Sequence, residues 1–344
     1  MLKVAVIGLG DVSDIHLSAI SENPGVSLVA VCDIDESLNG TVEGSKFYSD
    51  YHEMLEREKL DCVHICLPHH LHYEATKACV EKGIHVYLEK PLAENITAGE
   101  SIVELEQKYK ESKICISFQN RYNETVMKLQ EIVSSGKYGS ITGLKGMVAW
   151  HRPSSYYELK PWRGMMKYAG GGVMINQAIH TLDLMQLIGG KIDKVRGTVD
   201  KLMDYEVDIE DTVTANFVFS NGAKGLFFAT NANVTDSSVE LQVFCEHATF
   251  TIKDSILTME TANNIKEKII EDKRLPGKKF YYGAGHEILI NHFYSCIKSD
   301  SQNYISAQEA LISLQIIDAI KKSSEMKKFV YMEDYKQLDA LGTN

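Results

Sequence analysis

Two side chains that can carry protons stand where the sequence predicts buried structure. Lys90 occurs in VYLEKPLA, directly after an apolar run, and a partly buried lysine with a depressed pKa exchanges protons readily. His180 lies in GGGVMINQAIHTLDLM, and histidine titrates nearest neutral pH. Both are therefore candidates for acid–base chemistry. The residues alone leave two alternatives open: a solvated lysine beside a turn proline, and a histidine in a satisfied hydrogen-bond network.

A polar stripe marks the segment that follows the three glycines, Gly170–Gly172. Asn176, His180 and Asp183 are spaced i, i+4 and i+7, so an unbroken helix would place them on one face. Gln177 is offset from Asn176 by about 100° and precedes His180 by three residues. Because a helix that is apolar nearly all round is buried, this stripe must face a partner or a cavity.

A glycine-rich turn follows the first apolar run, in KVAVIGLGDVS. The first glycine, Gly8, allows a tight turn, and Gly10 lets the backbone approach a pyrophosphate resting on the helix N-terminus. Ser13 holds the third position of the fingerprint, a mild departure from glycine or alanine. Between a strand and a helix, this turn predicts dinucleotide binding through Gly8, Gly10, Asp11 and Val12.

The acidic residue Asp33 ends the second strand, 25 residues after Gly8. An acid at this place accepts hydrogen bonds from the adenosine ribose hydroxyls. It also repels a 2′-phosphate, by about 4 kcal/mol at ~4 Å and an effective dielectric of ~20. No arginine or lysine follows in DIDES to offset that charge. We therefore predict NAD in preference to NADP, with a turn or capping role for Asp33 as the alternative.

Three histidines in LPHHLH, Leu67–His72, raise the question of a metal site. They stand at a strand end with no converging acid, which is not a typical set of metal ligands. In a nucleotide-binding fold this loop lies at the cofactor edge. We predict no metal, and cofactor contacts from Leu67, Pro68 and His72.

The order of elements predicts two domains. Up to Arg121, short apolar runs alternate with amphipathic helices, which indicates a parallel sheet covered on both faces. Beyond it, longer strands with alternating polarity, as in DTVTANFVF, indicate a mostly antiparallel sheet in an α+β domain. We predict a Rossmann domain over 1–121 and an α+β domain over 122–344. The predicted strands lie at 2–8, 26–32, 61–67, 83–89, 112–118, with a weaker one at 46–50, and then at 141–151, 194–203, 211–219, 223–230, 239–245 and 248–253.

Composition limits the classes of partner. The formal charge of -11 and pI of about 5.6 argue against nucleic acid and anionic membranes. No run approaches the length of a membrane span. The seven cysteines form no C-x-x-C pair, and Cys32, Cys62, Cys66 and Cys115 fall in strand-like runs. We expect buried thiols in a reducing, cytoplasmic environment.

Several motifs together resemble the Gfo/Idh/MocA family of oxidoreductases over about residues 1–190. They are the glycine turn, the Pro68–His72 segment, Glu89-Lys90-Pro91, FQNRYN at 118–123, Trp162-Arg163-Gly164 and the glycine-initiated N–H–D helix. The resemblance implies a nicotinamide ring near Lys90, with Glu89 and Asn120 beside the cofactor, and a Lys90–Pro91 bond that is often cis. It also implies a sugar, polyol, sugar-acid or nucleotide-sugar substrate, and a homodimer or homotetramer formed through the second sheet.

The substrate side is predicted around WHRPSSYYELKPWRG, residues 150–164. Aromatic faces suit the C–H faces of a sugar, and arginine suits carboxylate or phosphate; a loop packed by its own aromatics is the alternative. The predicted substrate-binding residues are Arg121, His151, Tyr156, Trp162, Arg163, Asn176, Gln177 and His180.

Reversible hydride transfer is the reaction that we predict from this resemblance. His180 removes the hydroxyl proton, Lys90 stabilises charge on the oxygen, and Asn176 orients substrate or histidine. Many relatives have aspartate where this chain has Asn176, and an asparagine cannot exchange protons, so an Asp–His relay is excluded here. Two alternatives remain: an NAD-dependent glycosidase that acts through transient oxidation, and a non-catalytic sensor of NAD and sugar.

Overall fold

The structure is a computed structural model that describes the chain except residues 262, 264, 274–283 and 336–344. The chain divides into two compact units. The first comprises Met1–Gln119 and Gly285–Leu311, and the second comprises Asn120–Ala284 and Ile312–Asn344. This division differs from the expected boundary after residue 121, because Gly285–Leu311 groups with the N-terminal unit.

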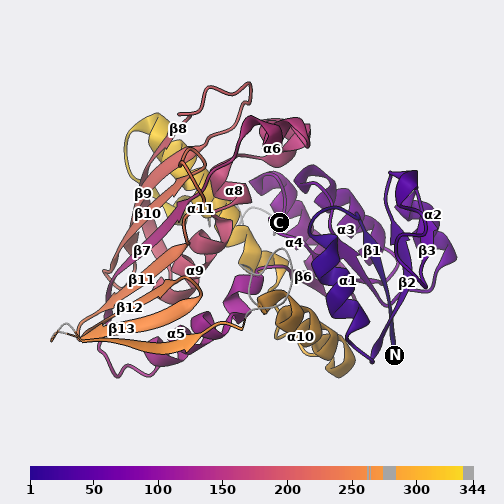
Figure 1. The fold of residues 1–344 in the computed structure, drawn as a ribbon, viewed down its shortest axis with the longest axis horizontal. Helices are drawn as coiled ribbons and strands as arrows, with labels where there is room; N and C mark the ends of the chain where they lie inside the picture. The colour runs from indigo at the N-terminus through magenta and orange to yellow at the C-terminus, as the bar shows by residue number, and fades with distance from the viewer. Residues whose placement is uncertain (262, 264, 274–283, 336–344) are drawn as a thin grey trace, which may run out of the picture. The chain divides into compact units, whose positions relative to one another are not determined.

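The first unit holds a six-stranded parallel sheet in the order β3-β2-β1-β4-β5-β6 (Figure 1). This is the predicted Rossmann sheet, and the weak sixth run is its edge strand. Its strands are β1 Leu2–Ile7, β2 Val26–Cys32, β3 Lys46–Tyr48, β4 Cys62–Ile65, β5 His85–Leu88 and β6 Ile114–Ile116. Its helices are α1 Ser13–Ser21, η1 Glu36–Leu38, α2 Tyr51–Arg57, η2 His69–Leu71, α3 His72–Val80, α4 Ile96–Lys108 and α10 Gly285–Ser299.

Continuous apolar runs form the central strands because both faces of the sheet are covered. All four residues of β4 are buried, as are Val4 to Ile7 of β1. The four cysteines expected in this core, Cys32, Cys62, Cys66 and Cys115, are buried, and all seven cysteines of the chain are free thiols.

The second unit holds a nine-stranded sheet in the order β14-β13-β12-β11-β7-β10-β9-β8-β15. Only β7 and β10 pair in parallel, so the sheet is mostly antiparallel as predicted. Strands β13, β14 and β15 are additional to the predicted ones; β14 (KEKIIE) is highly charged and β15 is two residues long, so neither has the alternation of a half-buried strand. The strands are β7 Ile141–Ala149, β8 Ile192–Asp200, β9 Thr212–Phe219, β10 Lys224–Thr230, β11 Glu240–Cys245, β12 Ala248–Lys253, β13 Ile256–Thr261, β14 Lys266–Glu271 and β15 Val330–Tyr331.

Helices α5, α8, α9 and α11 lie beside this second sheet (Figure 1). The described helical segments from residue 119 onward, other than α10, are η3 Gln119–Tyr122, α5 Glu124–Ser134, α6 Ser154–Glu158, η4 Pro161–Gly164, α7 Met166–Ala169, α8 Val173–Asn176, α9 Ile179–Gly189, α11 Ala307–Met326 and η6 Met332–Tyr335. α9 packs against β7, where Gly146 has no Cβ and so admits Thr181 and Met185. In the described part of the chain, no helix has the length and apolar character needed to cross a membrane.

The glycine run before α8 is explained by backbone geometry. Gly170 ends α7 in the left-handed region at φ 78°. At Gly172 an added Cβ would overlap the carbonyl oxygen of Glu210. The Glu210 carboxylate accepts hydrogen bonds from the N–H groups of Gly172 (2.9 Å) and Met174 (3.2 Å). The run therefore lets the chain pass close to Glu210 and start the segment that leads to His180.

Gly172→Ala is expected to lower the free energy of unfolding by about 3 kcal/mol or more, because the new Cβ overlaps backbone atoms. Gly40→Ala is the matched control, since Gly40 has φ 82° with open space around it and should cost only about 1–2 kcal/mol of backbone strain. Urea unfolding of both variants measures the difference. Equal losses would contradict the close approach to Glu210.

Candidate active site

The glycine turn follows β1. This strand is the switch point of the first sheet, because β2 and β3 lie on one side of it and β4, β5 and β6 lie on the other. Gly8 has φ 90°, and an added Cβ would stand 2.6 Å from the carbonyl oxygen of Cys66. Its N–H donates to the Cys32 carbonyl at 2.8 Å. Only glycine fits these constraints, and this crevice is where open parallel sheets bind nucleotides.

The N-terminus of α1 opens directly after this turn. Its N-cap, Val12, offers no side-chain hydrogen bond, and Ser13 donates its hydroxyl to the Gly10 carbonyl at 2.7 Å. The first N–H groups of the helix thus lack a side-chain cap, the arrangement that suits a phosphate. Serine at the third fingerprint position is accommodated by its hydrogen bond to the turn.

Asp33 joins the end of β2 to the glycine turn. One carboxylate oxygen accepts from the Leu9 N–H at 2.7 Å, and the other accepts from the Asp35 N–H at 3.0 Å. The turn role left open by the sequence is therefore present. The same bonds hold a negative charge beside the turn, next to Ile34, whose side chain is 91% exposed. A carboxylate has further lone pairs for a ribose hydroxyl.

The residues of the loop after β4 differ in their exposure to solvent. Leu67 and Pro68 are partly exposed, whereas His72 is fully buried. The ring nitrogens of His72 lie 2.8 Å from the Pro91 carbonyl and 2.9 Å from the Leu67 carbonyl. We therefore expect His72 to hold these two loops in position rather than to touch a cofactor directly.

Glu89, Lys90 and Pro91 follow β5 at the same sheet edge, and the Lys90–Pro91 peptide bond is cis. Glu89 is 5% exposed, with a carboxylate oxygen 2.9 Å from Nε2 of His16. This acid faces the protein interior, so its expected contact with the cofactor would be indirect. Among the described residues, His16, Glu89 and His286 form a group of potential metal ligands within 4.8 Å; the histidines of the Leu67–His72 loop are not part of it.

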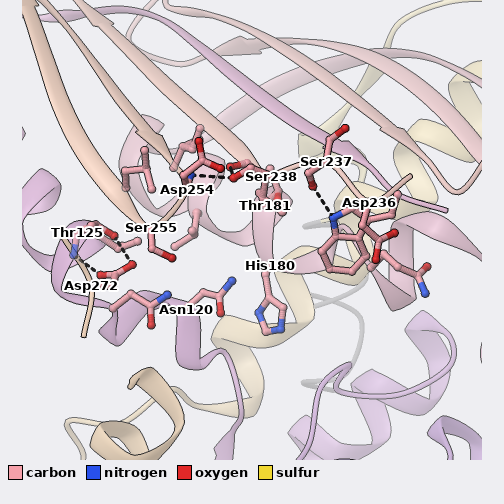
Figure 2. A pocket seen from close by; sticks show the side chains of 18 of the residues that line it. Asn120, Thr125, His180, Thr181, Asp236, Ser237, Ser238, Asp254, Ser255 and Asp272 are labelled. Carbon is pink, nitrogen blue, oxygen red and sulfur yellow. Dashed lines mark hydrogen bonds between the residues drawn. The ribbon is translucent and has the colours of Figure 1, made fainter. Parts of the chain in front are cut away.

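A cavity of about 470 Å³ lies in the second unit (Figure 2). Its wall includes His180 from α9, Asn120 from η3 and Asp254 from the turn between β12 and β13. The wall combines apolar surface with amide, hydroxyl and carboxylate groups that point into the cavity (Figure 2). The lining residues are Asn120, Asn123, Thr125, Val126, Trp150, Arg152, Gln177, His180, Thr181, Leu184, Asp236, Ser237, Ser238, Val239, Leu241, Ile252, Asp254, Ser255 and Asp272.

Two amide groups in this wall have hydrogen-bonding capacity to spare. The side-chain oxygens of Asn120 and Asn123 are buried and have no hydrogen-bond partner within the part of the chain that the structure describes. Such buried acceptors are costly unless a ligand or water satisfies them. Beside them, Asp272 accepts from the backbone N–H and hydroxyl of Thr125, at 2.8 and 3.0 Å. Burial raises the pKa of Asp272, although its bonds to Thr125 oppose that shift.

The predicted single helix with an i, i+4, i+7 stripe is wrong. The helix breaks between Asn176, the last residue of α8, and Ile179, the first of α9. The N–H groups of Gln177 and Ala178 both reach the Val173 carbonyl, and Ala178 adopts φ -102°, ψ -1°, outside regular helix. The break separates Asn176 from His180, so Asn176 is not in the cavity wall and Gln177 is.

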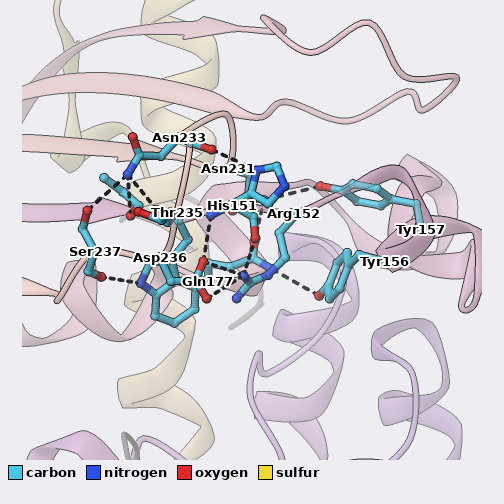
Figure 3. Close-up of polar contacts among 12 residues, drawn as sticks. His151, Arg152, Tyr156, Tyr157, Gln177, Asn231, Asn233, Thr235, Asp236 and Ser237 are labelled. Atoms are coloured by element: carbon cyan, nitrogen blue, oxygen red, sulfur yellow. Dashed lines mark hydrogen bonds and ion pairs between the residues drawn. The ribbon is translucent and has the colours of Figure 1, made fainter.

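Gln177 has a defined position in this wall (Figure 3). Its amide nitrogen donates to the Tyr156 hydroxyl at 3.2 Å, and its oxygen accepts from the Asn231 amide at 3.1 Å. Asn231 also lies 3.4 Å from the Tyr157 hydroxyl. The network ties α6 to the strand end after β10 and holds Gln177 at the cavity.

Arg121 forms a bidentate ion pair with Asp183. Its Nε and Nη2 donate to the two carboxylate oxygens at 2.8 and 2.7 Å, and the two side chains are 10% and 2% exposed. This bidentate pair fixes α9 one turn beyond His180. We therefore expect Arg121 to position α9, in place of the direct substrate contact that the sequence suggested.

The aromatic loop packs largely on itself, the alternative left open by the sequence. Tyr156 meets Tyr157 edge-on, and the Arg163 guanidinium lies 4.4 Å from the centre of the Tyr156 ring and 5.9 Å from that of Trp162. His151 is exposed and bonds the Asn233 carbonyl (Figure 3). Of these predicted residues, none lines the cavity directly, and Tyr156 supports it through Gln177.

Sequence reasoning missed several residues of the cavity. Arg152 lies in the basic aromatic run 150–164 and is one of them: its guanidinium stacks 4.8 Å from the centre of a Trp150 ring and pairs with Asp236 at 3.1 Å. The loops between strands carry Asp236, Ser237, Ser238, Asp254 and Ser255. The short polar clusters TDSS and KDS were the available signal, and such clusters usually mark turns.

The sequences of both units match models of known protein families. A family model described as an oxidoreductase family with an NAD-binding Rossmann fold matches residues 2–116, and a GFO/IDH/MocA C-terminal domain model matches residues 126–251. The chain belongs to the Gfo/Idh/MocA family. Its family is one of oxidoreductases, and its first unit matches the NAD-binding Rossmann fold of that family.

Full-length relatives carry enzyme names. Myo-inositol 2-dehydrogenase of Thermotoga maritima is 25% identical over 97% of this chain and 99% of its own length. D-glucoside 3-dehydrogenase of Escherichia coli is 25% identical over 94% of this chain and 95% of its own length. The fold matches WlbA dehydrogenase of Bordetella pertussis, solved with NADH and UDP-GlcNAcA (TM-score 0.83, 24% identity, 96% and 98% covered). It also matches levoglucosan dehydrogenase, solved with NADH and levoglucosan (TM-score 0.85, 21% identity, 96% and 99% covered).

Asp183→Asn is expected to lower the free energy of unfolding by about 3–5 kcal/mol, because it leaves the Arg121 charge buried without its carboxylate. Glu53→Gln removes an exposed partner of Arg57 and should cost less than about 0.5 kcal/mol. Urea unfolding compares the two. A loss for Asp183→Asn as small as that for Glu53→Gln would contradict the positioning role of this pair.

Proposed function

We propose that this protein oxidises a secondary alcohol of an uncharged polyol or sugar, with NAD as the hydride acceptor. The observation that carries the proposal is the cavity of the second unit, where His180 stands among amide and hydroxyl groups with unused acceptors at Asn120 and Asn123. A ligand with many hydroxyl groups satisfies such acceptors. The names of the full-length relatives, an inositol and a glucoside dehydrogenase, support the same class of substrate.

The charges around the cavity favour a neutral substrate over an anionic one. Three carboxyl groups, Asp236, Asp254 and Asp272, line it with one guanidinium, that of Arg152. Arg152 is already paired with Asp236 and stacked on Trp150. A sugar acid or nucleotide sugar brings negative charge that this wall does not balance. Trp150 offers an aromatic face for the C–H groups of a sugar ring.

In the proposed reaction, His180 takes the hydroxyl proton as general base while hydride leaves the same carbon for the nicotinamide. Lys90 hydrogen-bonds the oxygen and stabilises the charge that develops on it. Gln177, held by Tyr156 and Asn231, takes the orienting role first assigned to Asn176. The nicotinamide supplies the hydride acceptor, and the protein supplies the position and the proton transfer.

His180→Asn is expected to lower kcat about 10²- to 10⁴-fold while leaving the Kd for NAD unchanged, because it removes the base and not the nucleotide turn. The assay follows NADH formation with a panel of neutral polyols and sugars, uronic acids and nucleotide sugars. His247→Asn, which changes an exposed histidine of the same unit, is the matched control and should keep wild-type kcat.

Three results would contradict this assignment. Turnover of anionic sugars alone would rule out the neutral substrate class. A wild-type kcat in His180→Asn, with activity abolished in Lys90→Met, would move the base to Lys90. Release of an aglycone without net NADH would indicate the glycosidase reaction.

Asp33→Asn is expected to raise kcat/KM with NADP relative to NAD by roughly 10- to 100-fold, because it removes a charge that repels the 2′-phosphate. Asparagine keeps an acceptor for the Leu9 N–H, so the turn is retained. Asp35→Asn is the matched control, since Asp35 caps η1 two residues further on, and the ratio should stay unchanged. Wild-type preference for NADP would refute the cofactor proposal.

A further inference from the structure

A chain of buried polar side chains runs through the first unit to Glu89, the residue before Lys90. Tyr294 of α10 has its hydroxyl 2.7 Å from Nε2 of His64, and Nδ1 of His64 lies 2.8 Å from Nδ1 of His16. Nε2 of His16 lies 2.9 Å from the Glu89 carboxylate. His286 reaches the same carboxylate oxygen from the other side, at 3.6 Å.

These groups are shielded from water. His16 and His64 are 0% exposed, Tyr294 1%, His286 2% and Glu89 5%. A buried carboxylate costs several kcal/mol unless a positive charge or strong donors compensate it. Lys90 follows Glu89 in the sequence. The charge of these buried side chains is therefore balanced at the residue next to a group that we propose takes part in the reaction.

The two close ring nitrogens restrict where the protons lie. A contact of 2.8 Å between two imidazole nitrogens needs a single hydrogen between them. If His16 is charged, it donates from Nδ1 to His64 and from Nε2 to Glu89, and His64 donates from Nε2 to Tyr294. If His16 is neutral with its hydrogen on Nε2, it still donates to Glu89, but His64 then donates from Nδ1 to His16 and accepts at Nε2 from Tyr294, and the Glu89 carboxylate loses its adjacent positive charge.

Electrostatics select the charged form of His16. Burial alone would lower the pKa of His16, but contacts with Cys66 and with the Glu89 carboxylate 2.9 Å away raise it above its usual value. Burial raises the pKa of the Cys66 thiol, and contact with His16 lowers it. Burial, and then the charge on His16, hold the pKa of His64 well below its usual range. Burial opposes ionisation of Glu89, yet donors from His16 and His286 hold its pKa well below normal.

Three of the elements around His16, β4, β5 and α10, contribute groups to this balance. β4 and the residue after it bring His64 and Cys66, β5 and its end bring Tyr87 and Glu89, and α10 brings His286. Burial lowers the pKa of His286. The Glu89 carboxylate raises it, and the positive charges of His16 and Lys90 lower it further. His16 is thus the group in this cluster that carries the compensating proton.

We propose that His16 is a buried imidazolium that pairs with Glu89, so that Lys90 stands beside a compensated ion pair instead of a bare carboxylate. His16 is then a positioning residue for the proton chemistry of Lys90, and this part rests on the proposed function. The charge on His16 itself does not depend on the reaction, so the two can fail separately.

The charge on His16 is read directly by ¹⁵N NMR of the histidine rings in the full-length protein at pH 8. We expect hydrogens on both ring nitrogens of His16 and on Nε2 of His64, with assignment by the variants His16→Gln and His64→Asn. Glu89→Gln should convert His16 to a neutral ring at the same pH. His64→Asn keeps an acceptor at the Nδ1 position and should leave His16 charged. A neutral His16 in the wild type at pH 8 would overturn the proposal.

The kinetic consequence is tested with His16→Gln, which keeps an N–H directed at Glu89 and removes only the charge. The uncompensated carboxylate should hold the proton on Lys90 more strongly, so the alkaline limb of the pH–rate profile moves up by about one pH unit or more. A merely structural role would alter kcat and stability without moving that limb. An unmoved limb, with His16 shown to be charged, would overturn the effect on Lys90.

A metal ion is the rival occupant of the same three side chains, because their ligand atoms lie within 4.8 Å. A metal would need Nε2 of His16 without its hydrogen. Elemental analysis of the purified protein, before and after dialysis against a chelator, distinguishes the two. Stoichiometric zinc that is lost in His16→Gln would overturn the proposal, whereas unchanged thermal stability after chelation supports it.

Discussion

The buried carboxylate of Glu89 requires neighbouring elements of the first unit to supply hydrogen-bond donors or a positive charge. Glu89 is only 5% exposed, so other protein groups and not water must stabilise its negative charge. α1 supplies His16, and α10 supplies His286 from a segment far along the chain. This pairing gives a physical reason why Gly285–Leu311 groups with the N-terminal unit. The helix that returns completes the environment of the residue next to Lys90.

In the second unit, a comparable set of constraints orients His180. Glu210 fixes the close passage of the chain at Gly172, Arg121 holds Asp183 one turn beyond the histidine, and Asn231 holds Gln177. These contacts surround the helix break at Gln177–Ala178 and hold Gln177 at the cavity. They leave His180, Asn120 and Asn123 facing a cavity rich in hydroxyl and amide groups. Rigid support for a few reactive groups is the expected design of a site that must hold its substrate to within a fraction of an ångström.

Much of the fold could be predicted because it depends on local periodicity. The five buried runs and the glycine turn follow from short patterns, whereas the cis Lys90–Pro91 bond was implied only by the family resemblance. The break after Asn176 could not, since Gln177 and Ala178 are ordinary helix residues and tertiary contacts decide their conformation. His16 and His64 escaped notice because each sits singly in an apolar element, where a lone histidine carries no signal. Their partners lie on other elements, and only the fold brings them together.

The central claim is that hydride passes from the carbinol carbon of a neutral polyol to NAD. The direct measurement is mass spectrometry of the reduced nucleotide formed from a polyol deuterated at its carbinol carbons. The account predicts one deuterium in each NADH produced, in step with one molecule of ketone. Product formed without net NADH, or NADH without deuterium, would contradict it.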